Sequence, residues 1–143
     1  MKKVFGDTAI AAELAKRNIR LSSANSINWG RLVPQIVYYF AAYAQLIKAG
    51  RITFGDEVDF CVPTGNFGDI LAGYYAKRMG LPVGKLVCAS NENNVLTDFL
   101  TTGTYTAKRE FFKTTSPSMD ILVSSNLERL LYHVTGSDAR WRA

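Results

Sequence analysis

The sequence predicts an α/β fold with three layers, in which helices flank a mostly parallel sheet. Three observations predict it. Apolar, strand-like stretches alternate with helical patterns along the chain, an apolar strand runs directly into a glycine loop that opens a helix, and polar loops follow the strands. Such alternation favours parallel strands joined by right-handed crossovers, with ligands bound at the carboxyl ends of the strands.

Size and composition predict one globular domain. The chain has 143 residues, of which 48% are hydrophobic and 20% charged, as in ordinary soluble proteins. We expect a single α/β domain over residues 1–136 and a frayed tail over 137–143. The net charge of +5 comes from scattered lysines and arginines, without a basic run or an aromatic platform, so we expect no nucleic-acid partner.

Membrane and metal sites are not expected. The longest apolar-rich segment, residues 32–47, contains Pro34 and two glutamines and falls short of the about 20 residues that a membrane span needs. Cys61 and Cys88 lie in apolar strands without disulfide or metal-ligand spacing. We expect both to be buried, reduced thiols, which favours a cytoplasmic location.

The first half of the chain predicts two helices around a polar loop. A cap at residues 6–8 precedes an amphipathic helix over 9–16, and a short alternating strand follows at 19–22. Small polar residues over 22–28 predict a loop, and a long helix over 29–49 ends at Gly50. Pro34 fits this helix only in or near its first turn. Apolar residues occupy nearly its whole circumference, so we expect it to be covered on most sides.

The second half predicts alternating strands and helices. We expect strands at 58–62, 85–89 and 120–123, helices at 67–79, 94–100 and 127–134, and mostly loop at 104–118. The only histidine, His133, falls on the last helix without a nucleophile or carboxylate motif beside it, which favours a packed or surface side chain over a catalytic one.

The junction after the strand at 58–62 is the first candidate site. Gly65 and Gly68 let the backbone approach a ligand closely, and a helix opens at this point, so unpaired N–H groups and the helix dipole favour an anion. No Lys-Ser or Lys-Thr follows, unlike a Walker A motif, and the glycine spacing differs from the dinucleotide fingerprint, although Glu92 lies near the place of its ribose-binding acid. The loop suits the single phosphate of a coenzyme. Asp69 is expected in the first helical turn.

The polar loop at 22–28 is the second candidate site. Its Ser and Asn residues, Ser26 and Asn28 among them, suit a ligand or simply cap the next helix, and composition leaves both interpretations open. Arg31 follows one turn into that helix, where its guanidinium could bind a substrate phosphate with two parallel hydrogen bonds or could be an ordinary surface charge.

Three spaced motifs resemble threonine synthase over essentially the whole chain. They are residues 23–28 with Arg31 and Leu32, residues 63–69, and residues 116–121 with 124–129. The resemblance implies the tryptophan synthase β-like fold and a pyridoxal phosphate enzyme, a carbon-oxygen lyase that converts O-phospho-L-homoserine and water to L-threonine and phosphate. It also implies that the cofactor is bound by Gly65, Asn66, Phe67 and Asp69.

The chain departs from the family in what it lacks. The family's Schiff-base lysine lies well before the segment seen here, and the hydroxyl residue that faces the pyridine nitrogen lies well after it. We therefore expect an internal portion of the enzyme, inactive alone, with no catalytic residue in this chain. Its uncovered apolar faces predict self-association. The alternative is a stand-alone, non-catalytic α/β module that binds a phosphorylated small molecule or a partner protein.

Overall fold

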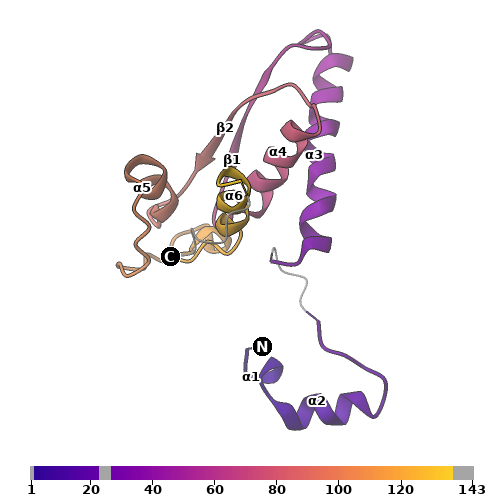
Figure 1. The fold of residues 1–143 in the computed structure, drawn as a ribbon, viewed down its shortest axis with the longest axis vertical. Coiled ribbons are helices and arrows are strands. Elements are labelled where there is room, and N and C mark those ends of the chain that lie inside the picture. The colour runs from indigo at the N-terminus through magenta and orange to yellow at the C-terminus, as the bar shows by residue number, and fades with distance from the viewer. Residues whose placement is uncertain (1, 23–26, 137–143) are drawn as a thin grey trace.

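A computed structural model describes residues 2–22 and 27–136 of this chain. Its helices are α1 (Lys2–Phe5), α2 (Thr8–Ala15), α3 (Trp29–Lys48), α4 (Gly68–Arg78), α5 (Val95–Thr102) and α6 (Leu127–Val134), its strands are β1 (Val58–Pro63) and β2 (Val83–Ala89), and a short 3₁₀ turn covers Pro117–Met119 (Figure 1). The predicted tail at 137–143 and the predicted site residue Ser26 lie outside the described residues. The boundary of the domain at residue 136 stays a prediction.

A parallel pair of strands joined by a helix lies at the centre of the fold. β1 and β2 run in register from Phe60 beside Leu86 to Pro63 beside Ala89, with one irregularity near the start of β1. The crossover is α4, which contacts both strands, and α3 packs on α4 (Figure 1). Mixed helices and a parallel sheet are therefore confirmed, although the sheet has only two strands in the part of the chain that the structure describes.

Two predicted strands were wrong. Residues 19–22 form no ladder within the described ranges. Residues 120–123 turn instead of extending, because Ile121 donates its backbone N–H locally to the Met119 carbonyl, 2.9 Å away. The Asp120 side chain also accepts a bond from the backbone N–H of Thr114, 2.9 Å away, and so fixes this segment to a loop.

The first two predicted helices begin and end within one residue of the bounds predicted from their capping residues. Asp7 accepts bonds from the N–H groups of Ala9 and Ile10, at 2.9 and 3.1 Å, and starts α2. Asn28 accepts a bond from Gly30 N–H, 2.9 Å away, and starts α3, which Gly50 ends with a φ of 65°. The predicted loop at 104–118 is also confirmed, apart from the start of the 3₁₀ turn.

Packing between α3, α4 and β1 makes the core. Leu32 of α3 and Leu71 of α4 are completely buried. The Tyr39 ring fits against Gly73, where an added Cβ would lie 2.7 Å from its Cε1 atom, and packs edge-on against Phe60 with ring centroids 5.0 Å apart. Pro34 is the sixth residue of α3, and its missing N–H costs the bond to the Gly30 carbonyl near the helix start.

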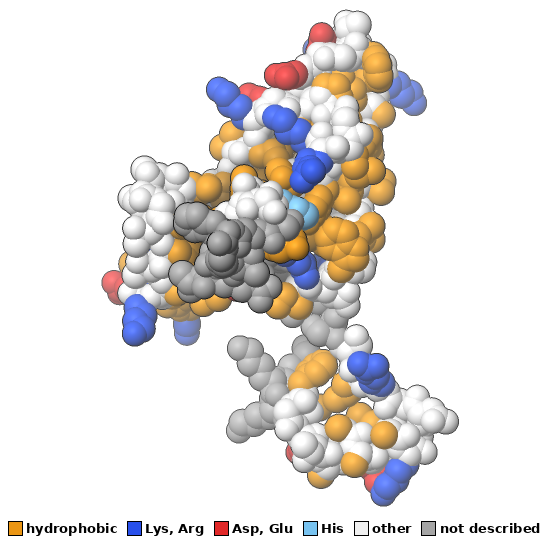
Figure 2. Space-filling view, viewed as in Figure 1, with side chains coloured by type: hydrophobic (Ala, Val, Ile, Leu, Met, Phe, Trp, Pro, Cys, Tyr) orange, Lys and Arg blue, Asp and Glu red, His pale blue; other side chains and the backbone are white. Residues whose placement is uncertain are grey.

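One face of α3 is uncovered in this chain. Val37 and Tyr38 are 62% and 61% exposed, so the expectation that this helix is covered on most sides was wrong for the chain as described. Hydrophobic side chains gather along this side of the molecule (Figure 2). The helix pair α1 and α2 lies apart from the other elements in Figure 1, and α2 has no buried residue.

The cysteines are both free thiols, as predicted, but Cys61 is exposed, and the expectation that it is buried was wrong. Burial alternates along β1, and Cys61 lies on the less covered face. Cys88 is half-buried, and this burial raises the pKa of its thiol. Among the described residues, no helix is long and apolar enough to cross a membrane and no group of His, Cys, Asp or Glu could hold a metal ion.

Candidate functional site

The glycine loop leaves β1 at the carboxyl end of the parallel pair. The Thr64 N–H donates to the Ala89 carbonyl, 2.7 Å away, and so continues the pairing by one residue. Phe67 then adopts a left-handed conformation with a φ of 63°, and α4 begins at Gly68. The helix start has no side-chain cap. Within the described part of the chain, no group accepts a hydrogen bond from the backbone N–H groups of residues 65–69.

A distant segment holds the other side of this loop. The Ser124 hydroxyl donates to the Gly65 carbonyl, 2.6 Å away. Asn126 donates twice to the Asn66 carbonyl, from its backbone N–H at 3.1 Å and its side-chain Nδ2 at 2.9 Å. A Cβ on Gly65 would lie 3.2 Å from Ile121 Cδ1. Packing against Ile121 therefore favours glycine at position 65.

Asp69 lies in the first turn of α4, as predicted. The Tyr39 hydroxyl is 2.9 Å from its backbone carbonyl and 3.3 Å from its Oδ1 atom, and donates to them. Partial burial raises the pKa of the Asp69 carboxyl, and the bond from Tyr39 opposes that effect. Burial, with the neighbouring Asp69, raises the pKa of Tyr39 strongly, so this hydroxyl stays a donor. The contact fixes the helix start to α3.

The second candidate loop is described from Ile27 onward. Asn28 caps α3, so the capping interpretation of its side chain is confirmed. Arg31 lies in the first turn of the same helix. The Ile27 carbonyl accepts a bond from the Arg129 guanidinium, 2.7 Å away, which fixes the end of this loop to α6. Roles in substrate binding for Ser26, Asn28 and Arg31 stay predictions.

A polar clasp links the loop after β2 to the segment before α6. Asp120 Oδ1 accepts bonds from the Asn91 amide at 2.8 Å and the Thr114 hydroxyl at 2.7 Å. The Asn93 side chain donates from Nδ2 to the Phe112 carbonyl, at 2.8 Å, and accepts at Oδ1 from the Phe112 N–H, at 3.0 Å. Hydrogen bonds, led by that from the Thr114 N–H, lower the pKa of Asp120. The sequence left the roles of these residues open.

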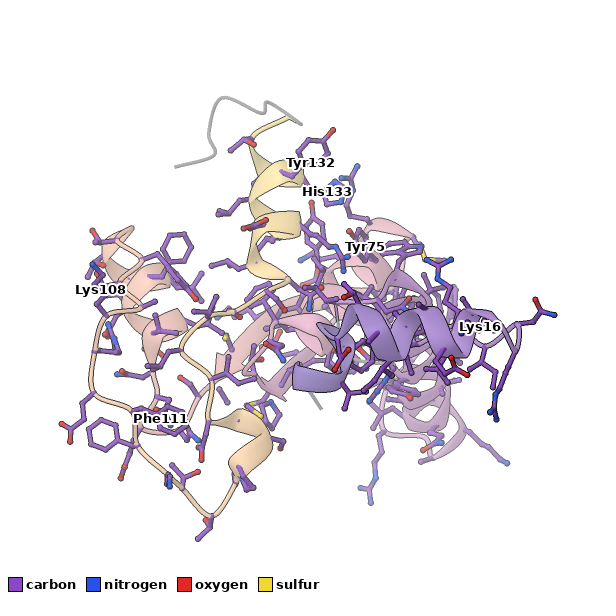
Figure 3. The ribbon with its side chains drawn as sticks, turned by 90° about the horizontal axis from the view of Figure 1, so that it is seen from below. Lys16, Tyr75, Lys108, Phe111, Tyr132 and His133 are labelled. Atoms are coloured by element: carbon purple, nitrogen blue, oxygen red, sulfur yellow. The ribbon has the colours of Figure 1, made fainter. Side chains whose placement is uncertain are left out.

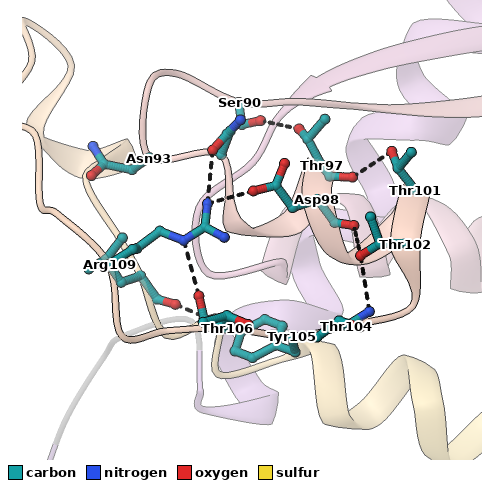
Figure 4. A network of polar contacts seen from close by, with 12 residues as sticks. Ser90, Asn93, Thr97, Asp98, Thr101, Thr102, Thr104, Tyr105, Thr106 and Arg109 are labelled. Atoms are coloured by element: carbon teal, nitrogen blue, oxygen red, sulfur yellow. Dashed lines mark hydrogen bonds and ion pairs between the residues drawn. The ribbon is translucent and has the colours of Figure 1, made fainter.

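A second network fixes the start of the long loop to α5 (Figure 4). The Arg109 Nη1 atom donates to Asp98 Oδ2 at 2.7 Å and to Asn94 Oδ1 at 3.0 Å. Its Nε donates to the Thr106 carbonyl at 3.0 Å. Sequence reasoning found only a polar loop here, because the partners of Arg109 are set by the fold. The network makes the loop an ordered part of the structure.

His133 is packed, as predicted. Its Nε2 lies 2.8 Å from the Tyr75 hydroxyl, and the two side chains meet between α6 and α4 (Figure 3). Burial raises the pKa of Tyr75. Both residues line an open groove of about 610 Å³, whose other lining residues are Trp29, Ile36, Arg78, Met79 and Gly136. None of residues 65–69 lines this groove, so we do not assign it to the phosphate loop.

Together these features define a parallel α/β unit with a glycine loop suited to a phosphate. Comparison with known proteins identifies the relatives, although no family model matches the chain. It is 53% identical over 142 residues to human threonine synthase-like 1, covering 98% of this chain and 19% of that protein. It is 47% identical over 144 residues to the threonine synthase of Schizosaccharomyces pombe, covering 94% of this chain and 26% of that enzyme.

A solved structure confirms the fold. The pyridoxal phosphate-bound threonine synthase of Brucella melitensis matches 97% of this chain with a TM-score of 0.83 and 49% identity, over 28% of its own length. The predicted resemblance to threonine synthase and the predicted tryptophan synthase β-like fold are therefore confirmed for this segment. The chain spans about a fifth to a quarter of the length of the relatives it matches.

Proposed function

We propose that this chain is a portion of a threonine synthase, which converts O-phospho-L-homoserine and water to L-threonine and phosphate with pyridoxal phosphate. In this proposal residues 65–69 bind the cofactor phosphate. The observation that carries it is the run of backbone N–H groups over 65–69, without acceptors among the described residues, at the uncapped start of α4. The similarity to threonine synthases over almost the whole chain supports it.

The residues present fit a cofactor phosphate. Successive N–H groups at a helix start, together with the helix dipole, bind an anion without needing a cationic side chain. A Cβ at position 65 would crowd Ile121 Cδ1, which favours glycine there, and Gly68 is buried at the helix start. When bound, pyridoxal phosphate supplies an electron sink that stabilises a carbanion.

In this proposal the residues of this chain hold the cofactor and orient the loop that binds it. Phe67, with a buried ring and a left-handed backbone, sets the turn that presents the N–H groups. Asp69, fixed by Tyr39, holds the first turn of α4 in place. Ser26, Asn28 and Arg31 are proposed to contribute to the substrate site, where the planar guanidinium of Arg31 is well suited to a phosphate.

The catalytic lysine is assigned to the rest of the enzyme. We propose that the lysine that links to the cofactor lies in the part of the relatives that this chain does not span, so that the chain alone is inactive. We also propose a cytoplasmic location, which the two free thiols support.

An activity assay on the full-length protein tests the proposal. With pyridoxal phosphate and O-phosphohomoserine, we expect equal amounts of threonine and phosphate, and no product without cofactor. The 143-residue chain assayed alone should bind cofactor without turnover. If the full-length protein binds the cofactor but releases neither product, the alternative of a non-catalytic module replaces the proposal.

A further inference from the structure

Asn126 occupies the cap position of α6 but does not cap it. Asparagine at this position usually accepts a bond from the backbone of the first turn. Here the side chain makes no such bond. The Asn126 Nδ2 atom donates to the Asn66 carbonyl at 2.9 Å, and Asn126 Oδ1 accepts a bond from Arg129 Nη1 at 2.6 Å. The residue is completely buried, so these two bonds replace the lost cap.

The direction of these bonds determines where the loop's N–H groups point. In a trans peptide the C=O and the N–H point in opposite directions. Ser124 and Asn126 hold the carbonyls of Gly65 and Asn66 on one side of the loop. The N–H groups of the same two peptide units, which belong to Asn66 and Phe67, therefore point to the other side, where an anion would bind.

Arg129 connects this brace to the second loop. Its Nη1 atom donates to Asn126 Oδ1 at 2.6 Å, and its Nη2 atom donates to the Ile27 carbonyl at 2.7 Å. One guanidinium therefore holds two segments that are 99 residues apart in the sequence, Ile27 and Asn126. The planar fork of the guanidinium sets both acceptors in one fixed geometry.

We propose that Asn126 and Arg129 are positioning residues. They hold the loop at residues 65–69 in a fixed position relative to Ile27, which precedes α3. The inference rests on the proposed function and adds to it the residues that align the cofactor loop with the start of α3, where Arg31 lies. Neither residue contacts the ligand in this proposal. Asn126 holds the Asn66 carbonyl and thereby orients the N–H donors of the cofactor loop. Arg129 orients the Asn126 amide and holds the Ile27 carbonyl.

The test uses the full-length protein and three variants. Arg129→Lys keeps the charge but loses the planar fork that bonds both acceptors. We therefore expect the Kd for pyridoxal phosphate and the KM for O-phosphohomoserine both to rise about tenfold, with a smaller change in kcat, as for the loss of a charge-assisted bond. Asn126→Asp replaces the donor to Asn66 by an oxygen but keeps the acceptor for Arg129, so we expect the Kd to rise by a similar factor and the KM to change less. Glu128→Gln, exposed in the same turn, should change neither constant.

Titration of cofactor fluorescence gives the Kd without reference to activity, and the melting temperature of each apo-protein reports folding. A rise in Kd at an unchanged melting temperature supports positioning. If Arg129→Lys and Asn126→Asp change only the melting temperature and leave the Kd within twofold, the inference is overturned while the proposed function stands. If the wild-type protein does not bind pyridoxal phosphate, the proposed function fails, and the inference fails with it.

Discussion

At the scale of single residues, Phe67 shows how packing supports an unfavourable backbone conformation. A non-glycine residue in the left-handed region costs about 1–2 kcal/mol, and Phe67 has a φ of 63°. Its ring is 5% exposed, and burying a phenylalanine contributes about 1.5–3 kcal/mol. The core therefore offsets the cost of a turn that directs the N–H groups of the loop away from the segment around Ser124.

Asp120 gives a prediction about pH at the same scale. Its pKa is lowered from the ordinary 3.8 because Thr114 and its neighbours donate hydrogen bonds to the ionised form. A lowered folded-state pKa adds stability that is present above pH 3.8 and is lost as the pH falls through the folded-state value. Asp120→Asn should therefore unfold at a lower temperature than wild type at pH 7.

The difference in melting temperature between wild type and Asp120→Asn should stay constant from neutral pH to about pH 5 and shrink below pH 4. Thermal unfolding followed by circular dichroism over this range measures it. As a control, Glu110→Gln replaces an exposed carboxylate on the same long loop. A difference that does not depend on pH would contradict the ionised clasp.

At the scale of elements, the crossing of α3 and α4 depends on Gly73. A Cβ there would lie 2.7 Å from the Tyr39 ring and 3.0 Å from Leu86, so the helices must separate or the ring must move. We expect Gly73→Ala to lower the free energy of unfolding by about 1–3 kcal/mol, typical of overpacking. Chemical denaturation measures this change.

Gly30→Ala in α3 is the matched control for Gly73→Ala. Its Cβ would meet only Asn28 Oδ1, at 3.3 Å, the atom that accepts the capping bond from Gly30 N–H, and no ring or neighbouring helix. The gain in helix propensity, at most about 1 kcal/mol, should offset part of the cost of weakening this cap, so we expect a smaller loss of stability than for Gly73→Ala. Equal effects of the two substitutions would show that the close approach at Gly73 does not limit the packing.

The sequence predicted elements well where the determinants are local. Asp7, Asn28 and Gly50 mark helix ends through their own backbone neighbours, and α2 and α3 form within one or two residues of the prediction. Strands need a partner, and neither predicted strand outside β1 and β2 finds one among the described residues. The exposure of Cys61 was missed for a similar reason, since coverage of a strand depends on distant elements.

The same limit applies to the candidate site. Glycines and a helix start within one short stretch made the 65–69 loop visible in the sequence. Ser124 and Asn126, which brace it, lie about 60 residues further on, and the sequence placed them only in a motif just before the last predicted helix. An asparagine before a helix can cap that helix or bond to a distant loop, and only the fold shows which of the two it does.

At the scale of the whole molecule, the uncovered face of α3 predicts that this chain associates with itself. Val37 and Tyr38 are more than half exposed beside Val33 and Phe40, and together they form an apolar surface. Sedimentation should show oligomers at micromolar concentration, and Val37→Lys should shift the chain toward monomer. Thr101→Lys, which adds the same charge on exposed α5, should not. A wild-type chain that sediments as a monomer would contradict this prediction.

Residues 65–69 are proposed to bind the phosphate of pyridoxal phosphate. The most direct measurement follows the backbone amide resonances of this chain by NMR during a titration with pyridoxal phosphate. We expect the largest shifts at Gly65, Asn66, Phe67 and Asp69. Shifts confined to the groove around Tyr75 and His133, or no saturable shift at 65–69, would contradict it.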